Sequence, residues 1–346
     1  MFGCDIGIDL GTASVLVYVS GRGIVLHEPS VVAISADTGS VMEVGSAAQR
    51  MVGRTPGGIL AIRPLKEGVI SDYDTTEKML RYFIRKVVGK SLFSRKPRVA
   101  VCVPAAVTDV HRRAIEGAVK DAGARQVFII EEPIAAAIGA GIDITAAKGS
   151  MILDIGGGTT DVAVIALGGI ISSTSIKVAG DDMNRAITGY IRKKWGLLIG
   201  ERTAEEVKIN VGTAYPRLAN ASMEIRGRSL FTGLPENRIV SSREIAKALE
   251  EPIDAVLKAI HSVLEATPPE LVADIVERGI VMTGGGGLLH GLDVLISERM
   301  GISAVIAEDA VSCVASGTGK YVEHIAQYNV GEFLVGKPEN TMEKYD

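Results

Sequence analysis

The sequence predicts an α/β protein built from two similar lobes, and three observations predict it. The chain has 346 residues, enough for two domains at roughly 100–200 residues each. Apolar strand-like runs alternate with amphipathic helical stretches. A strand–turn–strand pattern around Asp9 returns around Asp154, 145 residues later. Because that separation is about the size of one domain, we interpret the chain as an internal duplication.

The composition excludes several classes of protein. Hydrophobic residues make up 47% and charged residues 23%, which predicts a sizeable core and excludes disorder. The net charge of −4, from 37 basic and 41 acidic residues, gives no electrostatic footprint for nucleic acid, so we expect no nucleic-acid partner. No uncharged run reaches the roughly 18 residues of a membrane-spanning helix. Three dispersed cysteines (Cys4, Cys102 and Cys313) and an N-terminus without a signal core are typical of a cytoplasmic protein.

The first half predicts strands joined by short turns, followed by helices. Apolar runs and their turns predict strands at 6–10, 15–19, 23–26, 30–34, 41–44, 98–103 and 127–130. Asp74-Thr-Thr-Glu77 has the form of a capping box, and apolar residues then recur at helical spacing from Met79 to Val88. Further helices are predicted over 108–122, with Gly123 after the end, and over 134–141.

The second half begins with the repeated hairpin and then favours longer helices. Strand, turn and strand are predicted across 153–176, the longest uncharged part of which is 162–176. One helix is predicted over 181–195, and a second runs from a capping box at 203–206 to about Val211. A third starts at a capping box at 241–244 and is expected to kink or break at Pro252. A fourth starts at Pro268. A strand is expected at 279–283, then a glycine run, and a helix from about Leu288.

The two Asp/Gly/Thr hairpins carry the main chemical signal. Tight glycine turns expose backbone N–H groups that can bind phosphate oxygens, and an Asp at the strand end can hold Mg²⁺ through water. One such hairpin is weak support, because Asp-Gly turns are common in plain β-hairpins. Two related by duplication would clamp a polyphosphate from both sides. The alternative is a pair of unrelated hairpins whose glycines serve only the backbone.

Three other segments have a functional and a purely structural interpretation. Gly284–Gly287 could lie under a ribose or base, or could only let a helix pack closely on a sheet. Glu131-Glu132-Pro133 could orient or deprotonate an attacking water, or could only place acids at a helix N-terminus. Leu92 and Phe93, flanked by cations, could enter a membrane interface or could clip a loop to the core. From composition alone, the structural interpretation is favoured for each.

Other catalytic patterns are absent from the sequence. Gly89-Lys90-Ser91 lacks the earlier glycine of a Walker A loop, and no Gly-x-Ser-x-Gly elbow is present. The five histidines show no metal-ligand spacing, so we interpret them as structural or surface residues: His27, His111, His261, His290 and His324.

The motifs taken together resemble the actin/sugar-kinase/heat-shock-chaperone ATPase superfamily, and within it the MreB/Mbl family of bacterial actins. The phosphate 1, connecting, phosphate 2 and adenosine motifs are matched by 9–12, 131–137, 154–160 and 283–286. The similarity runs from end to end, through Glu28–Val32, Gly53–Gly57, Ile199–Ala204, Arg226–Arg228 and Pro268–Leu271.

The resemblance implies an actin-like fold, with two duplicated lobes, a smaller subdomain inserted in each, and a nucleotide cleft between them. Subdomain IA would comprise 1–31, 75–148 and 316–346, and subdomain IB 32–74. Subdomain IIA would comprise 149–184 and 246–315, and subdomain IIB 185–245.

The resemblance also implies the roles of single residues. ATP or ADP would contact Gly11, Thr12, Ala13, Ser14, Gly156, Gly157, Gly158, Thr159, Gly180, Asp181, Glu205, Lys208, Gly284, Gly285, Gly286 and Gly287. Asp9 and Asp154 would hold hydrated Mg²⁺. Glu132 matches the water-activating position, with Glu131 as the alternative and Thr159 beside them. Leu92 and Phe93 match the membrane-inserting loop of the family.

The implied function is a slow, Mg²⁺-dependent ATPase that forms filaments, expected as paired protofilaments, on the inner face of the cytoplasmic membrane. Such filaments organise the cell-wall (peptidoglycan) elongation proteins and determine rod shape. Ser14 stands where the family usually has Asn, and Asp161 where many members have Glu. A metabolic kinase, a chaperone-type ATPase and a non-enzymatic scaffold are the alternatives; length and the end-to-end similarity disfavour the first two.

Overall fold

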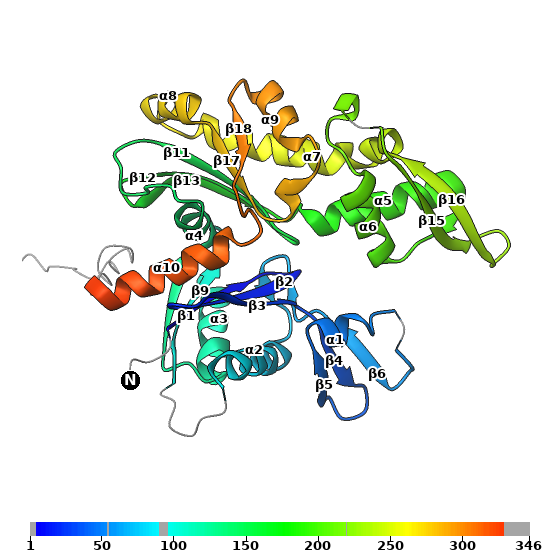
Figure 1. Ribbon diagram of the computed structural model, residues 1–346, viewed down its shortest axis with the longest axis horizontal. Coiled ribbons are helices and arrows are strands. Elements are labelled where there is room, and N and C mark those ends of the chain that lie inside the picture. The colour runs from blue at the N-terminus through cyan, green and yellow to red at the C-terminus, as the bar shows by residue number, and fades with distance from the viewer. Residues whose placement is uncertain (1–4, 54, 90–95, 219, 329–346) are drawn as a thin grey trace, which may run out of the picture.

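The computed structural model describes residues 5–53, 55–89, 96–218 and 220–328. The chain forms two lobes, one above the other in Figure 1, each built on a five-stranded sheet. The expected Leu92–Phe93 membrane loop lies outside the described residues. Among the described helices, none is both long and apolar enough to cross a bilayer.

The two large sheets have the same strand order, which confirms the predicted duplication. In the first lobe, β3(Gly23–Pro29), β2(Ser14–Val19) and β1(Asp5–Leu10) pair antiparallel, and β9(Arg98–Val103) and β10(Gln126–Glu131) continue parallel to β1. In the second lobe, β13(Gly169–Ile176), β12(Thr160–Ala166) and β11(Ser150–Ile155) are followed in the same way by β17(Ile280–Thr283) and β18(Ala304–Ile306).

Helices cover both faces of both sheets. The first lobe has α2(Tyr73–Val88), α3(Asp109–Asp121) and α4(Glu132–Gly139). The second has α5(Gly180–Trp195), α6(Glu201–Val211), α7(Ser242–Glu265), α8(Pro269–Arg278), α9(Leu292–Met300) and α10(Cys313–Tyr328).

The core is layered because the buried strands alternate their side chains between two apolar environments. Val99 and Val101 on β9 face a cluster with α2 and α3, whereas Ala100 and Cys102 face the centre of the molecule. On β11, Leu153 faces α5 to α9, and the neighbouring Ile152 faces the same central cluster. Side chains of α4 and α10 fill this central layer between the two sheets.

The helices α4 and α10 are exchanged between the lobes. Each follows the last parallel strand of its own sheet, yet α10 packs on β1, β2 and β9 of the first lobe, and α4 contacts β11 and β12 of the second. Glycines permit the close crossing of the two helices. A Cβ at Gly139 would lie 1.8 Å from the carbonyl oxygen of Cys313, and a Cβ at Gly317 would lie 1.7 Å from that of Ala135. The lobes are therefore joined through a shared core.

Small sheets lie at the outer end of each lobe. β4(Val32–Ser35), β5(Val41–Val44) and β6(Ile59–Ile62) form one, beside α1(Ser46–Gln49), within the predicted segment 32–74. β14(Leu197–Leu198), β15(Ser222–Ser229) and β16(Pro235–Ser241) form the other, within the predicted segment 185–245. The hairpin of β7(Leu65–Lys66) and β8(Val69–Ile70) connects the first small sheet to α2. The subdomain boundaries themselves stay a prediction.

Three predicted helix starts were wrong. The cap of α2 is Asp72, because its carboxylate accepts hydrogen bonds from the Thr75 amide at 3.0 Å and the Thr75 hydroxyl at 2.9 Å, so the helix starts before the expected 74–77 box. Helix α6 begins at Glu201 after Gly200, again before the expected box. The glycine run leads into a short 3₁₀ turn, Gly286–Leu288, and the next α-helix starts only at Leu292.

Candidate functional site

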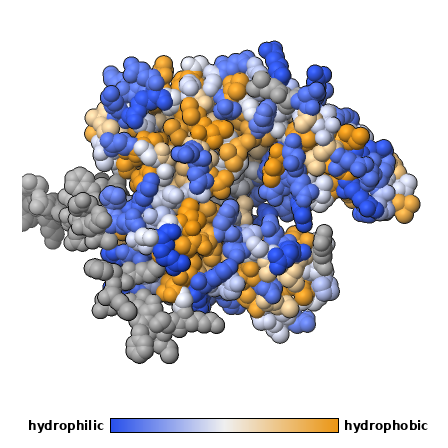
Figure 2. Space-filling model, in the orientation of Figure 1, coloured by the Kyte–Doolittle hydropathy of each residue, from blue (hydrophilic) through white to orange (hydrophobic). Residues whose placement is uncertain are grey.

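A cavity of about 540 Å³ lies between the lobes, where the β1–β2 and β11–β12 turns face each other. In the space-filling view, a notch separates the lobes on the side that carries the two small sheets (Figure 2). Cavities of this size are typical of small-molecule sites between structural units. Both turns follow a buried strand, so the fold fixes their positions rigidly.

The two turns have the same local geometry. The Gly11 amide donates to the Ser14 carbonyl at 3.1 Å, and the Gly156 amide donates to the Thr159 carbonyl at 2.9 Å, 145 residues later. The turns also approach each other closely. A Cβ at Gly157 would lie 2.6 Å from the Ala13 Cβ, so this position of the second turn has no room for a side chain.

Most of the predicted binding residues line this cavity. From the prediction these are Asp9, Gly11, Thr12, Ala13, Ser14, Glu132, Asp154, Gly156, Gly157, Gly158, Thr159, Gly180, Asp181, Glu205, Lys208, Gly284, Gly285 and Gly286. Gly287 and Glu131 are not among the lining residues. Glu131 instead lies 3.5 Å from Arg112, whereas the neighbouring Glu132 is buried and lines the cavity.

Sequence reasoning missed a second group of lining residues. They are Leu10, Leu16, His27, Gly68, Ile209, Leu288, Leu289, His290, Val311 and Val314. Most are apolar and carry no motif signal. His27 and His290 had been interpreted as structural or surface histidines, because only the three-dimensional fold brings them to the cavity.

Asp9 and Asp154 lie on the floor of the cavity, one from each lobe. Burial raises the pKa of Asp9 to about 7, and the Asp154 carboxylate adds to the rise. Burial also raises the pKa of Asp154 to about 6, partly offset by a 2.7 Å hydrogen bond from the Thr283 hydroxyl. Two buried carboxylates this close favour either a shared proton or a bound cation.

Glu132 and Asp161 extend this acidic group. Burial and the carboxylates of Asp161, Asp154 and Asp9 raise the pKa of Glu132 well above its usual value. Burial and Asp154 raise the pKa of Asp161 to about 7, although the Ala105 amide donates to its Oδ1 at 3.1 Å. The Oδ2 of Asp161 is buried without a hydrogen-bond partner. The sequence analysis noted Asp161 only as a departure from the family pattern and assigned it no role in the site.

The acidic group fits a hydrated divalent cation. Within the described ranges, no three His, Cys, Asp or Glu side chains come together as direct metal ligands. Asp9 and Asp154 are two carboxylates that repel each other, and Mg²⁺ is usually held by such groups through water. Such an ion would relieve the repulsion that raises their pKa values.

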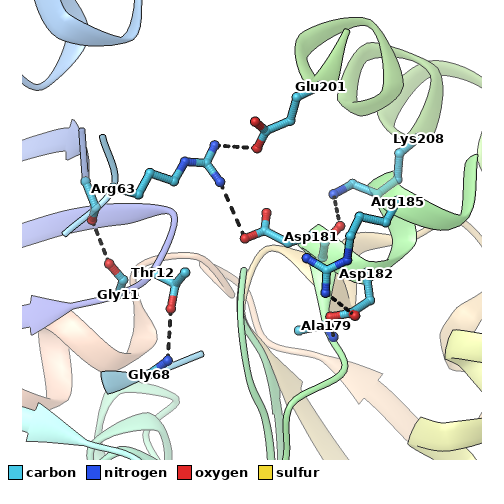
Figure 3. A network of polar contacts seen from close by, with 12 residues as sticks. Gly11, Thr12, Arg63, Gly68, Ala179, Asp181, Asp182, Arg185, Glu201 and Lys208 are labelled. Carbon is cyan, nitrogen blue, oxygen red and sulfur yellow. Dashed lines mark hydrogen bonds and ion pairs between the residues drawn. The ribbon is translucent and has the colours of Figure 1, made fainter. Parts of the chain in front are cut away.

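The other end of the cavity is formed by α6 and the segment after β17. The Lys208 ammonium donates to the Gly180 carbonyl at 3.0 Å (Figure 3). Burial lowers the pKa of Lys208, while Glu205 and Asp181 act in the opposite direction. Together with Ile209 and Leu288, these side chains give one end of the cavity a mixed apolar and charged lining. The arrangement suits a ligand with an anionic part at the two turns and a flatter, less polar part at α6.

Comparison with known sequences gives one family. The family described as MreB/Mbl protein matches residues 3–330. The cell shape-determining protein Mbl of Bacillus cereus (strain ATCC 10987 / NRS 248) is 54% identical over 325 residues, which cover 94% of this chain and 97% of that protein. The cell shape-determining protein MreB of Escherichia coli (strain K12) is 53% identical over 329 residues, covering 94% and 95%.

Comparison with solved structures gives the same fold. MreB5 of Spiroplasma citri bound to ADP has a TM-score of 0.90 and 39% identity, covering 95% of this chain and 99% of that one. The same protein bound to AMPPNP has the same TM-score and identity. A MamK double helical filament has a TM-score of 0.80 at 22% identity, covering 93% and 99%, and supports the actin-like fold alone.

Proposed function

The chain belongs to the MreB/Mbl family, and on that premise we propose that it is an actin-like ATPase whose filaments determine rod cell shape. The observation that carries the proposal is the pair of turns, 145 residues apart, that face one cavity with buried carboxylates beneath them. The relatives with bound ADP and AMPPNP support a nucleotide as the ligand. The relatives named as cell shape-determining proteins support the cellular role.

In this proposal the turns bind the phosphates and the floor holds the ion. Gly11 to Ser14 from one lobe and Gly156 to Thr159 from the other contact the phosphate oxygens, mainly through backbone amides, which suits anions. Asp9 and Asp154 hold hydrated Mg²⁺, which supplies positive charge to the phosphates when bound. The base and ribose lie toward Glu205, Lys208 and the 284–286 segment.

Glu132 is the residue that we propose to orient the attacking water. Its carboxylate is buried in the cavity, and its pKa is raised, so it is a stronger base than an exposed Glu. Thr159, at the end of the second turn, lines the same cavity. Glu131 is the weaker choice because it faces Arg112 and does not line the cavity.

Membrane attachment and cell-wall partners belong to the same proposal. Leu92 and Phe93 would enter the inner face of the cytoplasmic membrane. One such pair contributes only a few kcal/mol, but a filament repeats it many times. Replacing both with Ser should release the protein from anionic liposomes and leave its assembly with nucleotide intact. The filaments would then organise the proteins that elongate the cell wall.

The test is sedimentation with ATP and Mg²⁺, with and without anionic liposomes. We expect nucleotide-dependent pelleting that lipid strengthens and that Asp154→Ala abolishes, because the hydrated ion loses an anionic anchor. Glu132→Gln should keep nucleotide binding but slow ATP hydrolysis, measured as the inorganic phosphate produced. Hydrolysis without pelleting under any condition would contradict the filament proposal and favour a kinase that needs an acceptor.

A further inference from the structure

A cluster of ion pairs joins the two lobes at the edge of the cavity. Arg63 stands between β6 and β7 of the first lobe. Its guanidinium reaches two carboxylates of the second lobe, Glu201 at 2.7 Å and Asp181 at 3.4 Å (Figure 3). Asp181 lines the cavity, whereas Arg63 and Glu201 do not. We call these three residues the latch.

The geometry of the latch suits an arginine. Asp181 lies in the first turn of α5, and Glu201 is the first residue of α6. The planar fork of a guanidinium can contact both carboxylates at once, which a lysine ammonium cannot do as well. The Arg63 and Asp181 side chains are only 27% and 20% exposed, so solvent weakens their attraction less than at an open surface.

The backbone holds each side of the latch in place. On the first lobe, the carbonyl of Pro64, next to Arg63, accepts hydrogen bonds from the Ser71 amide at 2.9 Å and the Asp72 amide at 3.2 Å. On the second lobe, the Asp181 amide donates to the Gly157 carbonyl at 2.8 Å. The backbone at Asp181 is therefore tied directly to one of the two turns that face the cavity.

The first-lobe side also reaches a turn of the cavity. Gly68, in the β7–β8 turn five residues after Arg63, donates its amide to the Thr12 hydroxyl at 3.1 Å. In the same turn, Glu67 forms a further ion pair across the cleft with Lys177, at 3.0 Å. Separation of the lobes at their outer ends would have to break the Arg63 contacts.

We propose that Arg63 is a positioning residue that holds the cavity closed and limits the release of its nucleotide. This inference rests on the proposed function, because it requires a nucleotide in the cavity. Arg63 does not line the cavity itself and forms its ion pairs with Asp181 and Glu201 across the cleft, so it would control escape through the closure of the lobes. Its effect should appear in the dissociation rate more than in the rate of hydrolysis.

The experiment measures dissociation of a fluorescent ADP by stopped flow, in excess unlabelled ADP with Mg²⁺. Arg63→Ala should raise the dissociation rate about tenfold, the scale of one partly buried charge-assisted contact. Arg63→Lys should give an intermediate rate. Added NaCl should accelerate release from the wild type more steeply than from Arg63→Ala, because salt screens the latch. Arg50→Ala, which removes an exposed arginine from the same small region, is the matched control and should leave the rate unchanged.

A double-mutant cycle tests the pairing itself. Glu201→Ala should also speed nucleotide release. The double variant Arg63→Ala/Glu201→Ala should show a smaller effect on the dissociation rate than the two single effects combined, because both substitutions remove the same ion pair. Fully additive effects, or a wild-type rate in Arg63→Ala, would overturn the latch while leaving the proposed function intact. Failure of the wild type to bind the labelled nucleotide would instead refute the proposed function and the latch with it. If Arg63→Ala does not fold, Arg63→Lys and Glu201→Ala decide by the same criteria.

Discussion

The β1–β2 and β11–β12 hairpins are two copies of one structure that now carry different chemistry. Each has an Asp at the end of its first strand and the same amide-to-carbonyl bond across its turn. In the first hairpin the residue opposite Asp9 is Leu16, whereas in the second the residue opposite Asp154 is Asp161. The two hairpins therefore share a backbone, while only the second carries a buried carboxylate opposite its strand-end Asp.

The two turns also differ in their residues, and these differences are complementary in shape. The first carries side chains at Thr12 and Ala13, whereas the corresponding positions of the second are Gly157 and Gly158. A Cβ at Gly158 would lie 2.6 Å from the Thr12 Oγ1, just as one at Gly157 would meet Ala13. The turn of the first lobe carries the side chains and the turn of the second carries only glycines at these positions, so the two turns can pack closely in this combination.

Making the first hairpin resemble the second should have the largest effect on the stability of the protein. Leu16→Asp would bury a second carboxylate opposite Asp9, without the backbone donor that Ala105 gives to Asp161. We expect a loss of about 3–5 kcal/mol in the free energy of unfolding, measured by urea denaturation of the nucleotide-free protein. Leu16→Val is the control and should cost far less. Equal stability of Leu16→Asp and wild type would mean that the two positions tolerate charge alike.

Removing the additional charge should change how stability depends on pH. Asp161 has a pKa of about 7 in the folded protein against 3.8 in the unfolded chain. Between pH 4 and pH 7 the folded state keeps a proton that the unfolded state has lost, so stability falls as pH rises through this window. At 1.4 kcal/mol per pKa unit, the rise from 3.8 to about 7 makes the fall attributable to Asp161 roughly 4 kcal/mol.

The measurement is urea denaturation at several pH values in EDTA, comparing the wild type with Asp161→Leu, which copies Leu16. The variant should show a shallower decline, although Asp9 and Asp154 still contribute to it. Parallel curves for the two proteins would show that Asp161 does not titrate in this range.

Exchanging a methyl group between the turns tests their complementarity. Gly157→Ala should destabilise the protein by about 1–3 kcal/mol, because its Cβ would overlap that of Ala13. Combining it with Ala13→Gly should restore much of the loss, as measured by thermal unfolding. Gly57→Ala, where an added Cβ meets nothing within 4 Å, is the control. A double variant no more stable than Gly157→Ala would contradict the packing account.

The smallest effect on stability is expected from the loss of a single hydrogen bond, one that the first turn forms and the second turn lacks. Thr12→Val keeps the shape of the side chain but leaves the Gly68 amide without its acceptor. The cost should be about 1 kcal/mol, seen as a lower urea midpoint, and Thr12→Ser should recover it. If Thr12→Val is as stable as the wild type, water replaces the hydroxyl at Gly68.

The duplicated hairpins could be predicted from the sequence because strand alternation, tight turns and a fixed spacing are local signals. Other features depend on contacts between distant residues. The sequence analysis did not identify α10, although its side chains contribute to the shared core, because glycine and polar residues interrupt its apolar spacing. It expected a kink or break at Pro252; α7 runs without a break from Ser242 to Glu265, and the kink stays a prediction. The β15–β16 hairpin was missed because most of its side chains are exposed and polar.

In the candidate site, too, some residues could be predicted from the sequence and others could not. Residues within motifs, such as Asp9 and Gly156, could be named from the sequence, and so could Glu132. Arg63 could not, because its partners Asp181 and Glu201 lie more than 100 residues away and no local pattern marks an ion pair across a cleft.

The exchange of α4 and α10 limits how the chain can be divided. A cut between residues 148 and 149 would take α10 from β1, β2 and β9 of the first half and α4 from β11 and β12 of the second, exposing apolar side chains such as Ala100 on one half and Ala163 on the other. Each fragment expressed alone should therefore aggregate, whereas co-expression of the two should give a soluble complex. By the same geometry, a half-length ancestor could have been soluble as a symmetric pair of chains that traded helices, later fused into one polypeptide.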